Sequence, residues 1–487
     1  MGAVEILVIC LSSSLCLYFL LTLILGLHTL WWTPIHIKNQ LGSQGIKGPS
    51  YRFFHGNTKE IFNMQKEATS KSMNISHDIF SSTLPHVHSR VNKYDNKNLS
   101  RYKNYLQWYG PRAQLVVTEP ELIKEIMNNR DNAYPKPEIS NYTKKLLRDG
   151  LVTFEANIKI CNISRVTRLN FLRKDSHLQN VIPSMISSVE VMLERWKNHE
   201  GKETDVYEEF RLLTSEAISR TAFGSSYLEG KNIFQVSWTQ VNVVLKLFVH
   251  FYSKIYKTND DIESEELVKG IHNTILEIIK KREEKVMTGE GSSFGGDFLQ
   301  LLVEAHHDAN ASLKISIEDL VDECKIFYIA GKETTKKARK EVLNLFGQQN
   351  PNPDGITKLK TVRIMIINES LRLYPPVIAI ARKVEREVKL GKLTLRLIYC
   401  YVHLFKPERF SEGVAKATNN NIAAFFPFGV GPRSCVGLNF ATTEAKIALS
   451  MILQLYAFTL SPTYVHSPFQ LLTIRPQHGV QVMLHSL

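Results

Sequence analysis

The hydrophobic pattern begins with a long uncharged run. Residues 6–32 contain no Asp, Glu, Lys or Arg and are rich in Leu, Ile, Val and Phe. These 27 residues can cross a bilayer with some tilt. Trp31 and Trp32 end the run as interfacial aromatics do, and Lys38 and Lys47 follow, which predicts a membrane anchor with the rest of the chain cytosolic. A cleavable signal peptide is the alternative, although the run lacks a basic start and a small-x-small exit.

Helical periodicity dominates the chain after residue 115. Apolar residues between 267 and 282 recur every three or four positions and predict an amphipathic helix that ends in Lys280-Lys281-Arg282. Strand patterns are clearest at residues 113–118 and 479–484. The Gly/Ser-rich loop at residues 288–296 is too short, and too closely flanked by helices, to establish a domain boundary. The pattern predicts a mainly α fold with small β-sheets (α+β) in one body.

Charge and cysteine usage narrow the function classes. The chain has 60 Lys and Arg against 47 Asp and Glu, a net charge of +13. The basic residues are dispersed through mixed-sign helices, which argues against a nucleic-acid partner and suits an anionic membrane or an acidic electron-donor protein. The six cysteines are scattered and form no C-x-x-C pair. This spacing argues against a disulfide scaffold or a zinc site.

One cysteine stands in a loop that could present it to a metal. The stretch 428–437 reads Phe-Gly-Val-Gly-Pro-Arg-Ser-Cys-Val-Gly, and an apolar helix is predicted from about Leu438 to Tyr456. Its glycines allow turns and a close approach to a flat ligand. The positive end of the helix is expected to favour the thiolate of Cys435 over the thiol. A free buried cysteine in a Gly-rich turn is the alternative reading of the same residue.

Three further motifs precede this loop. Gly331-Lys-Glu333-Thr334 lies in a helical run and offers an acid and an alcohol that could organise a water chain for proton supply. A kinked surface helix is the plain alternative. Glu369 and Arg372 share one face of a predicted helix that begins around Thr361. Pro407-Glu-Arg409-Phe supplies a second arginine.

These motifs, in this order, resemble those of the cytochromes P-450, the haem-thiolate monooxygenases. The resemblance implies that Cys435 ligates the iron of haem b, that Arg433 pairs with a propionate, that Phe428 packs near the sulfur, and that Gly431 and Gly437 shape the loop. It implies that Glu333 and Thr334 handle protons and that Glu369, Arg372 and Arg409 form a structural network. Residues 332–335 and Tyr374-Pro375-Pro376 are similar to the plant microsomal members.

The resemblance also implies a function and a cellular setting. It implies insertion of one atom of dioxygen into a hydrophobic terpenoid- or hormone-like molecule, with electrons from an NADPH-dependent flavin reductase. The expected organisation is an anchor at 1–33, a hinge at 34–49 and a haem domain at 50–487, held single-pass in the endoplasmic reticulum membrane. Acceptor patterns at Asn74, Asn98 and Asn162 would carry glycans only if the body were lumenal.

The sequence also departs from the family pattern in three places. No Trp-x-x-x-Arg helix occurs around residues 150–165, although Arg165 and Arg168 are nearby. The chain is short after Thr335 and again within residues 391–403. Each gap is expected to expose apolar neighbours and leave backbone ladder groups unpaired. The alternative function is therefore a catalytically impaired relative that lacks internal segments.

Overall fold

Helices and four small sheets make up the described body. The computed structural model describes residues 3–76, 79–93, 104–128, 133–137, 175–223, parts of 272–350, 351–359, 367–384, 386–395, 399–403, 425–431, 434–435, 437–470 and 473–487. Helices predominate among these residues, and the strands form sheets of two to four members. The predicted class, mainly α with small β-sheets, is confirmed.

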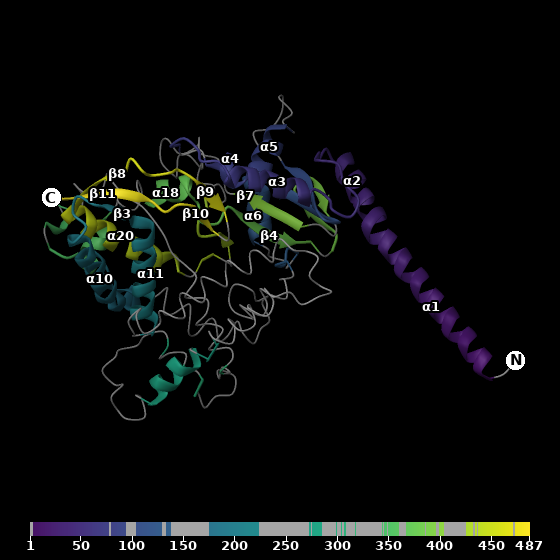
Figure 1. Cartoon of the computed structure of the whole chain (residues 1–487), viewed down its shortest axis with the longest axis horizontal. Helices are drawn as coiled ribbons and strands as arrows, with labels where there is room; N and C mark the ends of the chain where they lie inside the picture. The colour runs from purple at the N-terminus through teal and green to yellow at the C-terminus, as the bar shows by residue number, and fades with distance from the viewer. Residues whose placement is uncertain are drawn as a thin grey trace.

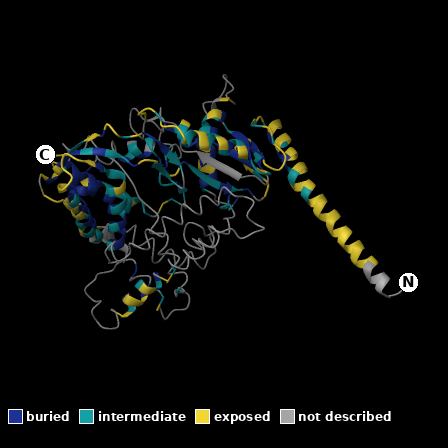
Figure 2. Ribbon diagram, in the orientation of Figure 1, coloured by how far each residue is buried: buried dark blue, intermediate teal, exposed yellow. Residues whose placement is uncertain are grey.

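A helical rod leads into the body. α1 (Ala3–Leu27), the π-helical turn η1 (His28–Trp32) and α2 (Thr33–Ser43) follow one another without a break. α1 projects away from the rest of the molecule (Figure 1), and nearly all of its described side chains are exposed (Figure 2). From Ile9 to Ser43 the rod is long and apolar enough to cross a membrane, with a mean hydropathy of 2.1 in its most apolar window. Within the predicted segment 34–49, residues through Ser43 are helical, and Ile37 and Leu41 are buried.

The largest sheet has four strands in the order β1-β2-β7-β4. β1 (Tyr105–Tyr109) and β2 (Arg112–Val117) form a hairpin whose turn places Gly110 at a φ of 55°. β7 (Tyr399–His403) runs parallel to β2 and antiparallel to β4 (Ala379–Lys383). The strand predicted at residues 113–118 is confirmed as β2.

β7 corrects the expectation of unpaired ladder groups within residues 391–403. Cys400 of β7 is aligned with Leu115 on one side and with Arg382 on the other, so this strand pairs along both edges. The preceding stretch forms a hairpin of β5 (Val388–Leu390) and β6 (Leu393–Leu395), which turns at Gly391 with a φ of 56°. The described backbone groups of β5, β6 and β7 are therefore paired in ladders, although the segment is short.

α6 connects this sheet to the cysteine loop. α6 (Pro120–Asn128) starts with proline at its first position, and its apolar face buries Ile123, Ile126 and Met127. These side chains share a hydrophobic core with Trp108 of β1, Leu115 of β2 and Val430 of the cysteine loop. The loop is thus part of the core under the four-stranded sheet.

A second core lies around the helix that follows the cysteine. α20 (Leu438–Leu455) packs against α10 (Asp175–Lys197), and both share buried apolar side chains with α11 (Val206–Phe223). A three-stranded sheet of β3 (Glu203–Asp205), β11 (Gln481–Ser486) and β8 (Tyr456–Leu460) covers this group. The predicted helix after Gly437 and the predicted C-terminal strand are confirmed as α20 and β11.

Shorter elements complete the described body. Residues 275–284 are helical and bury Ile275 and Ile279, which confirms that part of the helix predicted at 267–282. The loop predicted at 288–296 lies outside the described residues. The remaining elements are α3 (Thr58–Thr69), α4 (Phe80–Thr83), α5 (Pro85–Lys93), α17 (Pro353–Lys358), α18 (Asn368–Leu373), β9 (Pro468–Gln470) and β10 (Ile474–Pro476).

Candidate functional site

The cysteine loop folds back on itself through backbone hydrogen bonds. The Gly429 N–H donates to Phe426 O at 2.8 Å, and the Cys435 N–H donates to Phe428 O at 2.7 Å. Gly429 and Gly431 have φ values of 74° and 78°, in the left-handed region that favours glycine. The loop therefore brings the backbones of Phe428 and Cys435 together, and the Ser434 N–H adds a bond to Gly431 O at 3.1 Å.

Gly431 is also the point at which the loop touches α6. A Cβ atom at this position would lie 2.8 Å from Met127 O and 3.4 Å from Asn128 Oδ1. Backbone atoms cannot move aside as a flexible side chain does, so any larger residue would push the loop off the end of α6. This contact fixes the loop between the core of the four-stranded sheet and the start of α20.

Cys435 presents its thiol at the N-terminal end of α20. The residue is exposed and forms no disulfide. Protein atoms crowd the thiol on one side, and this desolvation raises its pKa, while hydrogen bonds from the Gly437 and Leu438 N–H groups act in the lowering direction. The N–H groups at the helix end thus act in the direction that the sequence predicts, but desolvation is the larger effect, so the pKa of the free thiol lies above its ordinary value. A coordinated metal cation deprotonates a thiol outright.

α20 carries two buried charged residues that contact neighbouring helices. Lys446 Nζ donates to Ile356 O of α17 at 2.8 Å. Glu444 is buried, and burial raises its pKa from 4.5 to about 7, while contact with Thr214 of α11 has the smaller, lowering effect. Sequence reasoning missed both residues. The signal that could have found them is a Glu and a Lys on an otherwise apolar helix, where charged residues are rare unless paired.

Several predicted site residues fall outside the described part of the chain. These are the proton-handling pair Glu333 and Thr334, and Arg433 in the loop itself. The structural arginine Arg409 lies outside as well. α18 carries both Glu369 and Arg372, so the predicted helix is present there. The roles of all these residues stay predictions, as do those of Phe428, Gly431, Cys435 and Gly437.

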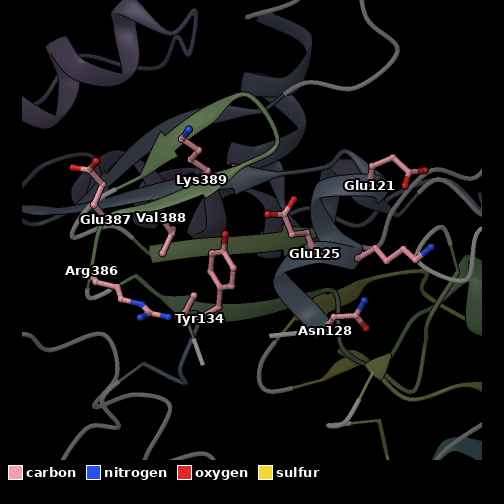
Figure 3. A pocket seen from close by; sticks show the side chains of 10 residues that line it. Glu121, Glu125, Asn128, Tyr134, Arg386, Glu387, Val388 and Lys389 are labelled. Atoms are coloured by element: carbon pink, nitrogen blue, oxygen red, sulfur yellow. The ribbon is translucent and has the colours of Figure 1, made fainter. Parts of the chain in front are cut away.

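A cavity of about 600 Å³ lies on the other side of α6. Figure 3 shows Glu125 pointing from α6 toward Tyr134, whereas Glu121 and Asn128 point away from it. Glu387 and Lys389 lie at the β5 side of the cavity. Lys124 also lines it, so cationic and anionic side chains are balanced. Ligand sites for apolar molecules are lined mainly by hydrophobic side chains, and this cavity is therefore a poor substrate pocket.

The donor set around Cys435 is that of a single sulfur. Among the described residues no group of three or more His, Cys, Asp or Glu could hold a metal ion. An exposed thiol in a loop with two glycines at positive φ could supply one ligand to an iron held by a flat macrocycle.

The comparisons with known sequences identify this arrangement. The family profile described as Cytochrome P-450 matches residues 79–482. A cytochrome P-450 of Panax ginseng, CYP749A22, is 53% identical over an alignment of 519 positions that covers 98% of this chain and 97% of that protein. The alignment is longer than the 487 residues of this chain, so the relative has positions that this chain lacks.

Another relative and a solved structure are also similar to this chain. The 11-oxo-beta-amyrin 30-oxidase of Glycyrrhiza uralensis is 35% identical and covers 94% of each chain. The crystal structure of the cytochrome P450DA heme domain superposes with a TM-score of 0.68, at 21% identity, over 79% of this chain and 89% of its own. This likeness shows the fold. None of these findings supports the alternative of a catalytically impaired relative.

Proposed function

The chain belongs to the cytochrome P-450 family of haem monooxygenases, and from that premise we propose that it oxidises a terpenoid-like hydrophobic small molecule with electrons from an NADPH-dependent flavin reductase. The observation that carries the proposal is the geometry of Cys435. An exposed thiol stands at the start of a buried helix, in a loop that places Gly429 and Gly431 at positive φ. Such a loop serves a ligand that approaches the backbone closely.

Haem b fits the residues that are present. The thiol of Cys435 is accessible, and the Gly437 and Leu438 N–H groups point at the sulfur, where they would partly neutralise a thiolate. Gly437 leaves the sulfur clear, since a Cβ there would lie 3.8 Å from Sγ. We therefore assign Cys435 as the iron ligand. When bound, haem supplies the redox chemistry that activates dioxygen, and a thiolate ligand favours O–O cleavage.

Residues of the chain itself would shield the sulfur, hold the haem and supply protons. Phe428 is held next to Cys435 by the 2.7 Å backbone bond, so its ring can limit water around the sulfur. Arg433, two residues ahead, supplies a cation for a haem propionate. Glu333 and Thr334 supply protons, which release of water from dioxygen consumes. Gly431 keeps the whole loop seated on α6.

The substrate class rests on the relatives. One relative is by its printed name an oxidase of 11-oxo-beta-amyrin, and it aligns over 94% of this chain. We extend an apolar terpenoid-like substrate to this chain, whose apolar helix from Ile9 would hold it at a membrane. The position that is oxidised depends on the shape of the pocket, which the motifs do not encode.

We further propose that the protein is single-pass in the endoplasmic reticulum membrane, with residues 1–33 as anchor, 34–49 as hinge and 50–487 as a cytosolic haem domain. The apolar helix from Ile9 supports the anchor. Asn74 lies in an exposed stretch and reports on the orientation. Digestion of the native protein with an endoglycosidase should leave its mass unchanged, and a mass loss would place the body in the lumen.

The carbon-monoxide difference spectrum of the reduced full chain tests the proposed function. We expect a thiolate-type Soret band in the native chain. The band should be lost completely in Cys435→Ser, because a neutral hydroxyl cannot replace a thiolate as the iron ligand. Cys10→Ser is the matched control, since Cys10 is also free and exposed but lies in α1. A Soret band that survived in Cys435→Ser would refute the assignment.

A further inference from the structure

A group of exposed apolar side chains lies at one end of the molecule. They come from α10, from the segment before α17, from the end of α20 and from the C-terminus. Figure 1 shows α10, α20 and the C-terminus at the end opposite α1. We call these five residues the C-terminal patch, and their exposed fractions are 40% at Val191, 37% at Leu343, 37% at Leu345, 50% at Leu455 and 56% at Leu487. Exposed apolar side chains grouped in this way mark an interaction surface.

Hydrogen bonds hold the segments of the patch together. The Gly347 N–H donates to Leu343 O at 3.0 Å, which closes the turn after Leu343. Gln454 Nε2 donates to Gly347 O at 2.8 Å, and this glutamine immediately precedes Leu455. The Leu487 N–H donates to Leu455 O at 3.1 Å. The exposed leucines of three separate segments are therefore close neighbours.

Part of the patch follows a place where the sequence is short for its family. Leu343 and Leu345 come soon after Thr335, where a gap predicts exposed apolar neighbours. Both leucines are exposed, whereas Phe346 beside them is 6% exposed and belongs to the second core. Apolar surface that the chain itself leaves exposed gains free energy when a partner covers it.

The rim of the patch on α10 carries charges of both signs. Asn350 Nδ2 donates to Glu190 Oε1 at 2.8 Å, which joins the leucine segment to α10 just before the exposed valine. One turn further along α10, Glu194 and Lys197 form an exposed ion pair, and Arg195 lies between them. A strongly acidic or basic partner would be favoured by a rim of the opposite sign, and these residues favour neither. A second copy brings the same mixed rim, so unlike charges can face each other across a two-fold axis.

We infer that the C-terminal patch is the contact surface between two copies of this chain, related by a two-fold axis through the patch. In such a contact the same surface lies on both sides, so the apolar side chains of one copy cover those of the other and the assembly closes at two copies. Leu455 ends α20, whose 18 residues place the patch about 25 Å from the cysteine loop that precedes the helix. The contact therefore uses no residue of that loop and does not depend on the reaction that the chain catalyses.

Photo-crosslinking in microsomes tests this contact in the full chain. p-Benzoylphenylalanine is placed at position 191, 455 or 465, one position per variant, and the adducts are identified by mass spectrometry. Val465 is the matched control, because it is 40% exposed like Val191 but lies in the loop that is bonded to residues 73–76. A fourth variant adds Leu345→Glu to the position-455 chain, which places a charge in the inferred contact. Far-ultraviolet circular dichroism of each purified variant establishes that it is folded.

We expect adducts between two copies at positions 191 and 455, with yields about tenfold above that at position 465. Leu345→Glu should lower the yield at position 455 about tenfold, because the contact would then bury an unpaired charge. Equal yields at positions 191, 455 and 465 would overturn the inference, and this comparison stands even if Leu345→Glu does not fold. Adducts to another protein or to lipid in place of a second copy would also overturn it. A ladder of higher oligomers would do the same, because a two-fold contact closes at two copies.

Discussion

The buried carboxyl of Glu444 makes the stability of this protein depend on pH. Burial raises its pKa from 4.5 to about 7 in the folded chain. The folded state therefore holds a proton that the unfolded state releases, so the free energy of unfolding falls as pH rises from about 4.5 to about 7 and is level outside that window. A pKa difference of this size corresponds to about 3 kcal/mol.

Glu444→Gln removes the titration while keeping the shape of the side chain. The Thr214 hydroxyl lies 2.9 Å from Phe210 O and can both donate and accept, so it remains a partner for a glutamine amide as it is for the carboxyl. We expect the variant to match the native chain at pH 4.5. At pH 8 the variant should be more stable than the native chain by up to about 3 kcal/mol. At this pH the folded native chain must either hold an ionised carboxyl in a buried site or keep a proton that the unfolded chain has released.

Urea denaturation of both chains between pH 4.5 and pH 8 measures this difference. Glu387→Gln is the matched control, because Glu387 is exposed and its substitution should change stability by less than about 0.5 kcal/mol at every pH. A stability difference between Glu444→Gln and the native chain that stays constant over this range would refute the reasoning. It would mean that the carboxyl does not titrate differently in the folded and unfolded states.

Substitutions at Gly431 and Phe54 test the cysteine loop and the left-handed backbone of residue 54. Gly431→Ala should lower the free energy of unfolding by roughly 2–4 kcal/mol in thermal melts, because its Cβ would clash with Met127 O at 2.8 Å in addition to the left-handed penalty. Gly45→Ala, at a φ of 84° but with no atom within 4 Å, should show only that penalty of about 1 kcal/mol, and equal losses would contradict the contact. Phe54→Gly should raise the melting temperature in detergent, with a gain of up to about 1 kcal/mol, and a fall would show that Phe54 is not strained.

The sequence pattern predicted the elements that local periodicity or composition specifies. α20 and β2 follow from apolar periodicity, and the apolar rod follows from composition alone. β7 was not predicted, because its residues lie in a stretch that is short for the family. Its pairing with β2 aligns Leu115 with Cys400, which lie far apart in the sequence, and only the assembled sheet determines such long-range pairing.

The site divides in the same way. The sequence by itself determined that Cys435 stands alone in a glycine loop before a helix, because turn conformation and helix start are local properties of the residues. The tertiary structure decided three further features. These are the contact of Gly431 with the end of α6, the desolvation that raises the pKa of the Cys435 thiol, and the burial of Glu444. Desolvation and close contact depend on which distant segments surround a group, and a linear pattern does not contain that information.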